Sequence, residues 1–524
     1  MCGLRFALLC CLVVPLGCAG KTYGVQQPFS VDVVDVRGEP LERLLLIASL
    51  QGIVNRDKPR LYLIHDAKTM TPTPSQHWLD YYRQKGWIDY TTITYEEALQ
   101  KYKDFTNGLV VWDDQLYATV NLAQGLAATQ DLLMAHESLL PLLQTMGYRI
   151  VEDLRGKFKD SLAVHQEIIN TVLPKATKDT IYNFPSEDRY TVLYRMSLLD
   201  YAISVRACSF GLRVDIPDQK SLLETMFSHL NRFAVLVGYC SPASLERPTV
   251  EFCSKHEVVT MIGSFMAFNY SFHRHIGKRA SLKQDHITSY PVDKNKIYIA
   301  LCLSDLGLNS MQSLYYEMWE SGDRGRIKLS WWMNPLVLDF CPGIAAYYYE
   351  TKTANDYFYA AHAAGRIRPS DFPSLDEYLK RSKDQLIRAD LKVICFSDHT
   401  VKNNSVLQAY SDTLGDIALG FSLGFGPLSG DVFDPYWFVA DELWVSPQVG
   451  PVTDYDSVFN QLKQYIASHS NRPLFIAVCV GIYDWIKISD LIKVKSDLDA
   501  LYPGEIEWVR ADELLAAIRK YENR

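Results

Sequence analysis

Apolar and polar positions along the first third of the chain follow two periods. Residues 31–36 (VDVVDV) form a short apolar run that predicts a strand, and the apolar residues from Leu41 to Val54 recur at helical spacing. The runs at 60–64 and 109–112 predict two further strands. A strand, a helix and a strand of these lengths are typical of a βαβ unit, which places parallel strands in one sheet.

The same alternation continues through the rest of the chain. A polar, turn-rich stretch at 174–190 precedes a predicted helix near 193–206, and a segment rich in Lys, His and Asp at 276–296 predicts a linker. Strands are predicted near 233–238, 258–262, 297–303, 327–332, 391–396, 438–444, 474–480 and 506–509. We therefore expect an α/β protein with βαβ-type domains at 25–180 and 181–290. A C-terminal α/β domain at 291–524 would be a doubly wound sheet or an incomplete barrel.

The first nineteen residues have the features of a signal peptide. Arg5 is the single early positive charge, Phe6 to Leu16 is apolar, and Gly17-Cys18-Ala19 offers small residues for cleavage. The apolar run is shorter than the roughly 20 residues that a membrane-spanning helix needs, and no later run is long enough. We therefore expect secretion without a transmembrane segment. A lipid anchor at Cys18 is less favoured, because Pro15 stands where a bacterial lipobox usually has Leu.

Charge and composition narrow the range of partners. The net charge is −8 and no long run of Lys or Arg occurs, which argues against nucleic acid. The seven cysteines beyond the leader include no C-x-x-C pair, His273, His275 and His286 match no ligand spacing, and no phosphate-binding motif occurs, so we expect neither a metal nor a cofactor. We expect those histidines to be solvated. The 32 Tyr, 10 Trp and 22 Phe favour a carbohydrate partner, although aromatic residues also fill large cores.

Polar and aromatic residues follow several of the predicted C-terminal strands. Loops at the carboxyl ends of parallel strands share one face of an α/β fold, and glycoside cleavage commonly uses two carboxyl groups about 5–9.5 Å apart. We predict Asp305 and Asp398 as the catalytic acid and the base or nucleophile. Predicted sugar contacts in the same domain are Trp331, Trp332, Asn334, Tyr357, Asp484 and Trp485. An aspartate after a strand is also a common turn former or helix cap.

Several stretches together resemble the GxGYxYP family of putative glycoside hydrolases. They are residues 46–63 (LIASLQGIVNRDKPRLYL), 108–128, 198–201, 268–273 (FNYSFH) and 331–373. The resemblance covers most of the chain. It implies several N-terminal domains and a C-terminal glycoside hydrolase domain that acts on carbohydrate.

The naming motif of that family is altered in this chain. Its seven positions fall on 363–369, where only Gly365 and Pro369 keep the pattern. Arg366 and Arg368 replace tyrosines, and we expect them to bind an acidic sugar through paired hydrogen bonds. The family's acidic loop, approximately SDGDN, reads SDLGLN at 304–309, so its second aspartate is missing.

Two functions stay open at this point. One is an active glycoside hydrolase, and the other is a catalytically inactive, glycan-binding member of the same fold. A metal-dependent deacetylase is less favoured, because no histidine pair accompanies Asp305.

Overall fold

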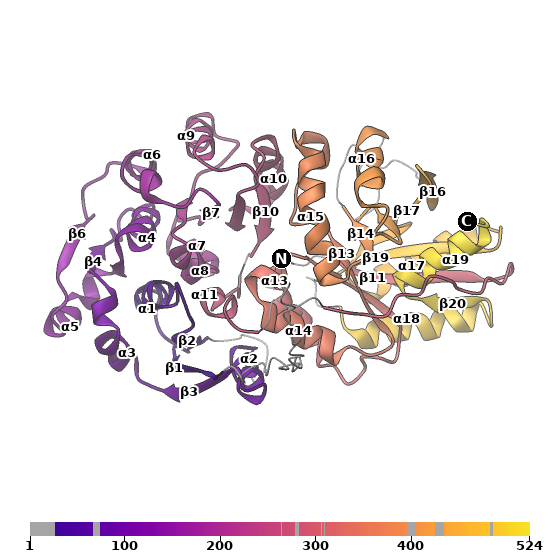
Figure 1. Cartoon of the computed structure of the whole chain (residues 1–524), viewed down its shortest axis with the longest axis horizontal. Helices are drawn as coiled ribbons and strands as arrows, with labels where there is room; N and C mark the ends of the chain where they lie inside the picture. The colour runs from indigo at the N-terminus through magenta and orange to yellow at the C-terminus, as the bar shows by residue number, and fades with distance from the viewer. Residues whose placement is uncertain are drawn as a thin grey trace, which may run out of the picture.

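A computed structural model describes residues 27–65, 74–263, 265–277, 282–304, 307–308, 310–396, 404–424, 434–482 and 486–524. Within these residues the chain forms four β-sheets, and all but one of their strand pairs are parallel. The three smaller sheets follow one another in an arc, and the largest sheet forms the other end of the molecule (Figure 1). The predicted α/β class is thereby confirmed.

The segment predicted as one N-terminal domain holds two of the small sheets. The first has the order β2-β1-β3 and the second the order β5-β4-β6. Their strands are β1 (Phe29–Asp35), β2 (Leu61–Ile64), β3 (Ile88–Thr92), β4 (Gly108–Val111), β5 (Leu132–Ala135) and β6 (Ile150–Asp153). Their helices are α1 (Leu41–Val54), α2 (Pro74–Gln84), α3 (Tyr95–Lys101), α4 (Thr119–Gln130), α5 (Leu140–Thr145) and α6 (Ser161–Glu167).

The third small sheet has the order β10-β9-β7-β8 and is parallel throughout. Its strands are β7 (Thr180–Asn183), β8 (Cys208–Phe210), β9 (Val235–Gly238) and β10 (Val259–Ile262). Its helices are α7 (Arg189–Arg195), α8 (Leu199–Ser204), α9 (Pro217–Ser228), α10 (Glu246–Lys255) and α11 (Tyr270–His273). The single helix predicted near 193–206 is thus two short helices, because Leu198 between them adopts φ +66°.

The C-terminal sheet is a curled half-barrel of ten strands within the described residues, so the incomplete barrel is the correct alternative. Its strands are β11 (Ile297–Ser304), β12 (Leu329–Met333), β13 (Asp356–Ala361), β14 (Val393–Cys395), β15 (Gly420–Ser422), β16 (Tyr436–Val439), β17 (Glu442–Val445), β18 (Val449–Val452), β19 (Leu474–Gly481) and β20 (Ile506–Val509). Its helices are α12 (Tyr315–Trp319), α13 (Val337–Phe340), α14 (Pro342–Thr351), α15 (Leu375–Ala389), α16 (Asn404–Leu414), α17 (Tyr455–Ser468), α18 (Ile488–Leu501) and α19 (Ala511–Tyr521).

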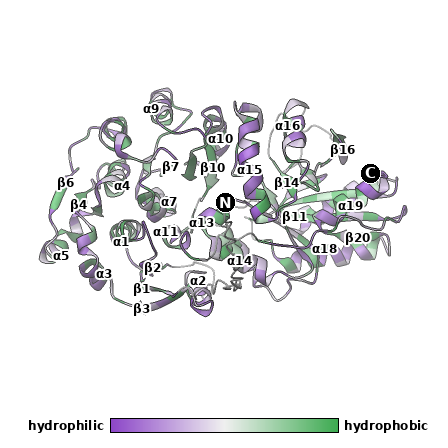
Figure 2. Ribbon diagram, in the orientation of Figure 1, coloured by the Kyte–Doolittle hydropathy of each residue, from purple (hydrophilic) through white to green (hydrophobic). Residues whose placement is uncertain are grey.

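Both faces of the half-barrel are covered. Helix α19 packs across the inner face, where Leu514, Leu515 and Ile518 contact inward-facing residues of the strands. Helices also pack on the outer face, as α12 does where Trp319 contacts Trp331. The strands are accordingly apolar on both sides, and Figure 2 shows them in green while the outer surface of α15 is largely purple.

The strand predicted at 438–444 is instead an antiparallel hairpin of β16 and β17. Val439 pairs with Glu442, and the two residues between them, Ala440 and Asp441, have φ +48° and +66°. Two residues with positive φ are what a tight hairpin turn requires. The usual Asn-Gly signal is absent, so the sequence did not reveal this turn.

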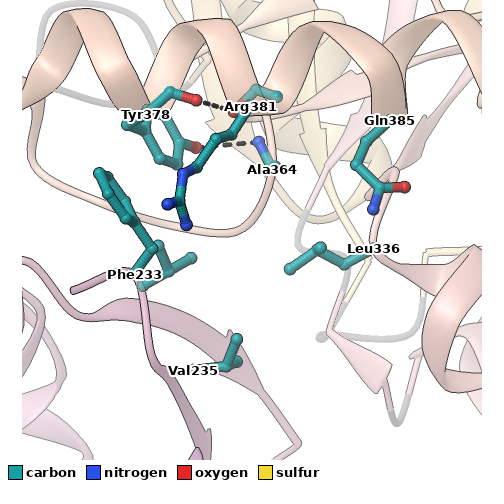
Figure 3. A pocket seen from close by; sticks show the side chains of 9 residues that line it. Phe233, Val235, Leu336, Ala364, Tyr378, Arg381 and Gln385 are labelled. Atoms are coloured by element: carbon teal, nitrogen blue, oxygen red, sulfur yellow. Dashed lines mark hydrogen bonds between the residues drawn. The ribbon is translucent and has the colours of Figure 1, made fainter. Parts of the chain in front are cut away.

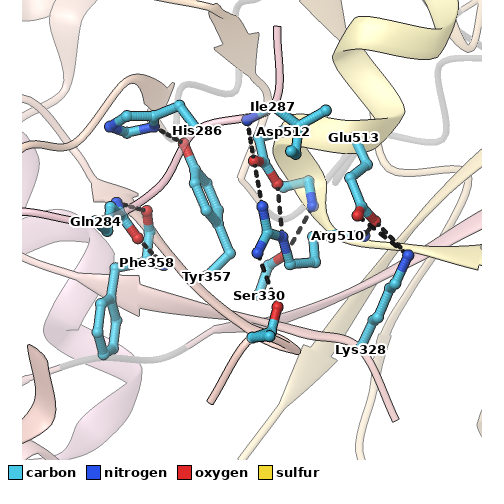
Figure 4. Close-up of polar contacts among 12 residues, drawn as sticks. Gln284, His286, Ile287, Lys328, Ser330, Tyr357, Phe358, Arg510, Asp512 and Glu513 are labelled. Atoms are coloured by element: carbon cyan, nitrogen blue, oxygen red, sulfur yellow. Dashed lines mark hydrogen bonds and ion pairs between the residues drawn. The ribbon is translucent and has the colours of Figure 1, made fainter. Parts of the chain in front are cut away.

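The segment predicted as a linker is held against the half-barrel where it is described. Gln284 exchanges two hydrogen bonds with the backbone of Phe358, and His286 lies 3.1 Å from Asp390 and 3.0 Å from the Tyr357 hydroxyl (Figure 4). The Ile287 N–H donates to Asp512, whose carboxylate also pairs with Arg510.

The prediction that the histidines around this segment are solvated is wrong for two of them. His273 is fully buried against Tyr82, and His286 lies in the network just described. Burial lowers the pKa of both imidazoles. The residues that bury these two histidines come from distant parts of the chain, so no local sequence pattern indicated their burial.

A cluster of buried amides joins the first domain to the third. The Gln51 amide donates to Oδ1 of Asn269, which also accepts from the Leu63 N–H, while Nδ2 of Asn269 donates to the Leu63 carbonyl. Asn55 donates to Ser271 in the same region. Gln51 and Asn55 belong to the family-like stretch 46–63 (LIASLQGIVNRDKPRLYL), and Asn269 and Ser271 belong to 268–273 (FNYSFH). These two family-like segments therefore form a structural junction.

Candidate functional site

The carboxyl edge of the half-barrel abuts the N-terminal domains. Leu308, which follows β11, accepts a hydrogen bond from the Tyr270 hydroxyl, and Phe340, beyond β12, contacts the ring of Tyr201. Beyond β13, Arg366 and Thr260 exchange two backbone hydrogen bonds of 2.8 Å. The loops at the catalytically favoured edge of the sheet thus meet the third domain.

Four of the predicted site residues, Asp305, Asp398, Asp484 and Trp485, lie outside the described residues. The strands that precede them in the sequence are described. β11 and β19 are neighbours, with Ser304 opposite Gly481, whereas β14 is three positions away from β11. Neighbouring strands are about 4.8 Å apart. Asp484 therefore follows the strand next to that of Asp305, and Asp398 follows a more distant one.

Trp331 and Trp332 point to opposite faces of β12, as successive strand residues must. Trp331 faces outward, is fully buried between Trp319 and Tyr315, and donates from Nε1 to Asp356 at 2.9 Å. Trp332 faces inward and donates to the Ala360 carbonyl. Neither indole offers an open face to a sugar in this structure.

Tyr357 and Asn334 are also buried. Tyr357 lies near the opposite, amino-terminal end of the half-barrel, where its ring packs 5.4 Å from the Arg510 guanidinium. Asn334 lies at the carboxyl edge, but its Oδ1 accepts from the Leu336 N–H at 3.0 Å. The structure therefore separates Tyr357 from the residues at the carboxyl edge and gives Asn334 a turn-forming contact.

Arg366 and Arg368 bind carboxylates of the third domain. Arg366 pairs with Glu246 at the start of α10, and Arg368 lies 3.0 Å from Glu251 of the same helix and 2.9 Å from Asp371. Both guanidinium groups are thus neutralised by acidic side chains. The altered naming motif joins the half-barrel to the third domain, and its arginines do not form an open cationic site for an acidic sugar.

The two motif residues that this chain keeps, Gly365 and Pro369, have structural roles. Pro369 opens a short 3₁₀ turn, at a position that proline favours. Gly365 adopts φ +86°, and a Cβ there would lie 2.3 Å from Cγ1 of Val259 and 3.1 Å from Cδ1 of Leu336. Only glycine fits this contact without displacing the side chain of Val259 on β10.

We predict that Gly365→Ala destabilises the protein by about 2–5 kcal/mol, measured from the urea midpoint. The left-handed backbone costs an L-residue about 1–2 kcal/mol, and overpacking adds about 1–3 kcal/mol. Gly504→Ala is the matched control, because Gly504 has φ +73° and open space around it. Equal losses in the two variants would contradict the close contact with β10.

Sequence reasoning missed His362, which lies at the carboxyl edge directly after β13. Its ring centroid is 5.5 Å from that of Trp332, and it adopts φ +67°, which is uncommon for a residue other than glycine. Burial, with the charge of Arg366, lowers its pKa to about 3. The neutral imidazole can exchange hydrogen bonds with a ligand hydroxyl. A histidine immediately after a strand and before the naming motif was the available signal.

A small pocket of about 240 Å³ lies behind the motif loop (Figure 3). The Tyr378 hydroxyl closes one side by donating to the Gly365 carbonyl, and the Arg381 guanidinium lies 4.2 Å from the ring centre of Phe233. Its other lining residues are mainly apolar, namely Val235, Val259, Leu336 and Ala364. A pocket of this size is smaller than typical ligand sites.

Among the described residues, no group of three or more His, Cys, Asp or Glu side chains is placed to hold a metal ion. Within the same residues, no helix is long and apolar enough to cross a membrane.

The fold and the position of this edge define a multidomain α/β protein with a C-terminal half-barrel. Models of the GxGYxYP family match it at 30–104 (first domain), 106–176 (second domain), 183–275 (third domain) and 295–519 (putative glycoside hydrolase C-terminal domain). The chain belongs to the GxGYxYP family, as the sequence predicted.

A solved structure, described as a putative hydrolase from Bacteroides thetaiotaomicron VPI-5482, is similar to this chain with a TM-score of 0.80. The similarity covers 94% of this chain and 95% of that one at 17% sequence identity, so it shows a common fold. No curated protein matches the chain significantly.

Proposed function

We propose that this protein is a secreted glycoside hydrolase that acts on carbohydrate at the carboxyl edge of the half-barrel. The observation that carries the proposal is the match of residues 295–519 to the family's putative glycoside hydrolase domain. The closure of this edge against the third domain supports it, because glycan sites commonly lie where loops of a barrel meet a second domain.

Asp305 is the proposed carboxylate common to the possible catalytic pairs. Asp398 is the partner predicted from the sequence, and Asp484 is the alternative, because it follows the strand adjacent to that of Asp305. Three strand spacings correspond to roughly 14 Å across a flat sheet. The distance between β11 and β14 exceeds the range for glycoside cleavage unless the curl of the sheet shortens it.

The first experiment measures hydrolysis of a panel of oligosaccharides by the wild type and by Asp305→Asn, Asp398→Asn and Asp484→Asn. Loss of a catalytic carboxyl group is expected to reduce turnover by about 10²–10⁴-fold while the fold is retained. Asp416→Asn is the control, because its carboxylate is exposed and pairs with Lys383. Full activity in Asp305→Asn would overturn the assignment.

A glycan-binding protein without activity is the second candidate. It is favoured by the missing second aspartate of the 304–309 loop and by the use of the naming motif as a domain contact. Binding of an oligosaccharide without any turnover would decide for this candidate.

Export is part of the proposal and is tested separately. N-terminal sequencing of secreted protein is expected to begin at Gly20, and material that began at Met1 would overturn it.

A further inference from the structure

The third-domain sheet contains a point at which the chain reverses its direction across the sheet. From β7 the chain crosses to β8 on one side, and then returns through α9 to β9 on the other side of β7. The segments after β7 and β9 therefore leave the sheet in opposite directions. In open parallel sheets, a crevice that binds ligands commonly forms outside the carboxyl ends of two such strands.

Two exposed tyrosine rings and a half-buried phenylalanine ring gather at this place. Tyr190 and Tyr194 lie on α7, which follows β7, and Phe265 follows β10 (Figure 1). Tyr190 is 72% exposed. Its ring plane lies within 9° of that of Tyr194, with ring centres 5.8 Å apart, and the planes of Tyr194 and Phe265 lie within 23° at 5.5 Å. The three rings form a slipped stack that is open to solvent at Tyr190.

Polar groups connect this stack to the half-barrel. The Arg195 guanidinium lies 4.8 Å from the ring centre of Tyr194 and 4.7 Å from that of Tyr239, which directly follows β9. The Tyr239 hydroxyl donates to Glu246, and Glu246 also pairs with Arg366 of the motif loop. A continuous line of contacts thus runs from the aromatic stack to the segment beyond β13.

We propose that these residues form a distal glycan subsite (Tyr190, Tyr194, Arg195, Tyr239 and Phe265). It binds an uncharged pyranose unit of the same chain that the half-barrel edge acts on, so the inference rests on the proposed function. The C–H face of the sugar ring lies on the aromatic stack.

The surroundings favour a sugar over a protein partner. The charged residues Glu187, Asp188 and Arg189 are exposed immediately beside the stack, so the apolar surface is narrow. A stable protein interface needs about 800 Å² on each partner. Glu187 and Asp188 would repel an acidic sugar, and an uncharged unit avoids this cost.

The test uses the full chain and a panel of neutral hexasaccharides (malto-, cello-, xylo-, laminari- and mannohexaose) with the matching disaccharides. Tyr190→Ala/Tyr194→Ala is expected to weaken hexasaccharide binding about tenfold, because each aromatic contact contributes roughly a factor of 2–10. Tyr190→Phe/Tyr194→Phe keeps both rings and is expected to retain the affinity. Hydrolysis or binding of disaccharides at the half-barrel edge should be unchanged in both variants. Tyr521→Ala, which removes an exposed tyrosine of α19, is the surface control.

The outcomes separate this subsite from the proposed function. If the wild type binds or cleaves hexasaccharides and the double alanine variant does so equally well, the subsite is overturned and the proposed function stands. If the wild type neither binds nor cleaves any glycan, the proposed function falls and the subsite with it. Self-association that is lost in the alanine variant, with unchanged glycan binding, would make this surface a protein interface and also overturn the subsite.

Discussion

Lowering the pH from 6.5 to about 5 is expected to lower the unfolding free energy of this protein by about 5 kcal/mol. His65, His165, His273 and His362 are buried, and burial lowers their pKa values to about 3, 4, 3 and 3. Each folded pKa lies below the unfolded value near 6.5, so the unfolded chain binds more protons between these values. The stabilisation is complete above about pH 6.5 and is lost as the pH falls.

The expected slope is about 4 kcal/mol of unfolding free energy per pH unit. Each of the four histidines contributes about 1.4 kcal/mol per pH unit to the slope. Below pH 6, Asp200 contributes a slope of similar size and opposite sign, because burial raises its pKa to about 6. A slope of this size removes the stability of a typical protein, about 5–15 kcal/mol, within a few pH units. Urea unfolding between pH 5 and 8 measures it directly.

His165 provides the variant for this test. Its Nδ1–H donates to the Ser161 carbonyl and its Nε2 accepts from the Gly211 N–H. A second proton would sit on Nε2 and face the Gly211 N–H, which is itself a donor. His165→Gln retains an acceptor for Gly211 and is expected to reduce the slope by about 1.4 kcal/mol per pH unit. The exposed His469→Gln is the control. A slope that is the same in all three proteins would contradict this origin of acid sensitivity.

Asn269→Ala is expected to destabilise the protein by about 3 kcal/mol or more. The substitution leaves the Leu63 N–H and the Leu63 carbonyl without their side-chain partner in a buried junction, while the Gln51 amide keeps only the Leu61 carbonyl as an acceptor. Each buried group left without a hydrogen bond costs about 1–3 kcal/mol. Asn269 also adopts φ +62°, a conformation that asparagine tolerates better than alanine.

The urea midpoint and the slope of the transition measure this loss. Asn231→Ala is the matched control, because Asn231 is exposed and its amide reaches only Asp179 at the surface, and such substitutions usually stay within about 0.5 kcal/mol. A loss below about 1 kcal/mol in Asn269→Ala would mean that water replaces the amide and that the junction is not a rigid connection.

Regular elements were predictable where a single side-chain period dominated. The helix predicted from Leu41 to Val54 has those bounds in the structure, because its apolar spacing continues unbroken. β13, with the residues DYFYAA, was not predicted from the sequence. These residues lie between α19 and the outer helices, and the local sequence does not indicate that both faces of the strand are covered.

The candidate site was less predictable because its geometry depends on distant partners. Trp331 and Trp332 lie on a strand that was predicted, but the helices that bury them were not evident from this segment. Arg366 and Arg368 are paired with Glu246 and Glu251, which precede them by more than a hundred positions. The order of the strand ends became visible only with the sheet.

The pairing of β11 has a consequence for synthesis of the protein on the ribosome. Ile297 of this central strand pairs with Leu474 of β19 and with Ile506 of β20, so two of its neighbours emerge long after it does. Contacts between such remote segments slow folding, because loop closure precedes any stabilisation. During synthesis, the apolar strand IYIALCLS therefore lacks two of its partner strands, β19 and β20, while the N-terminal domains can already fold. We expect nascent chains released before residue 474 to associate with chaperones or aggregate through this strand.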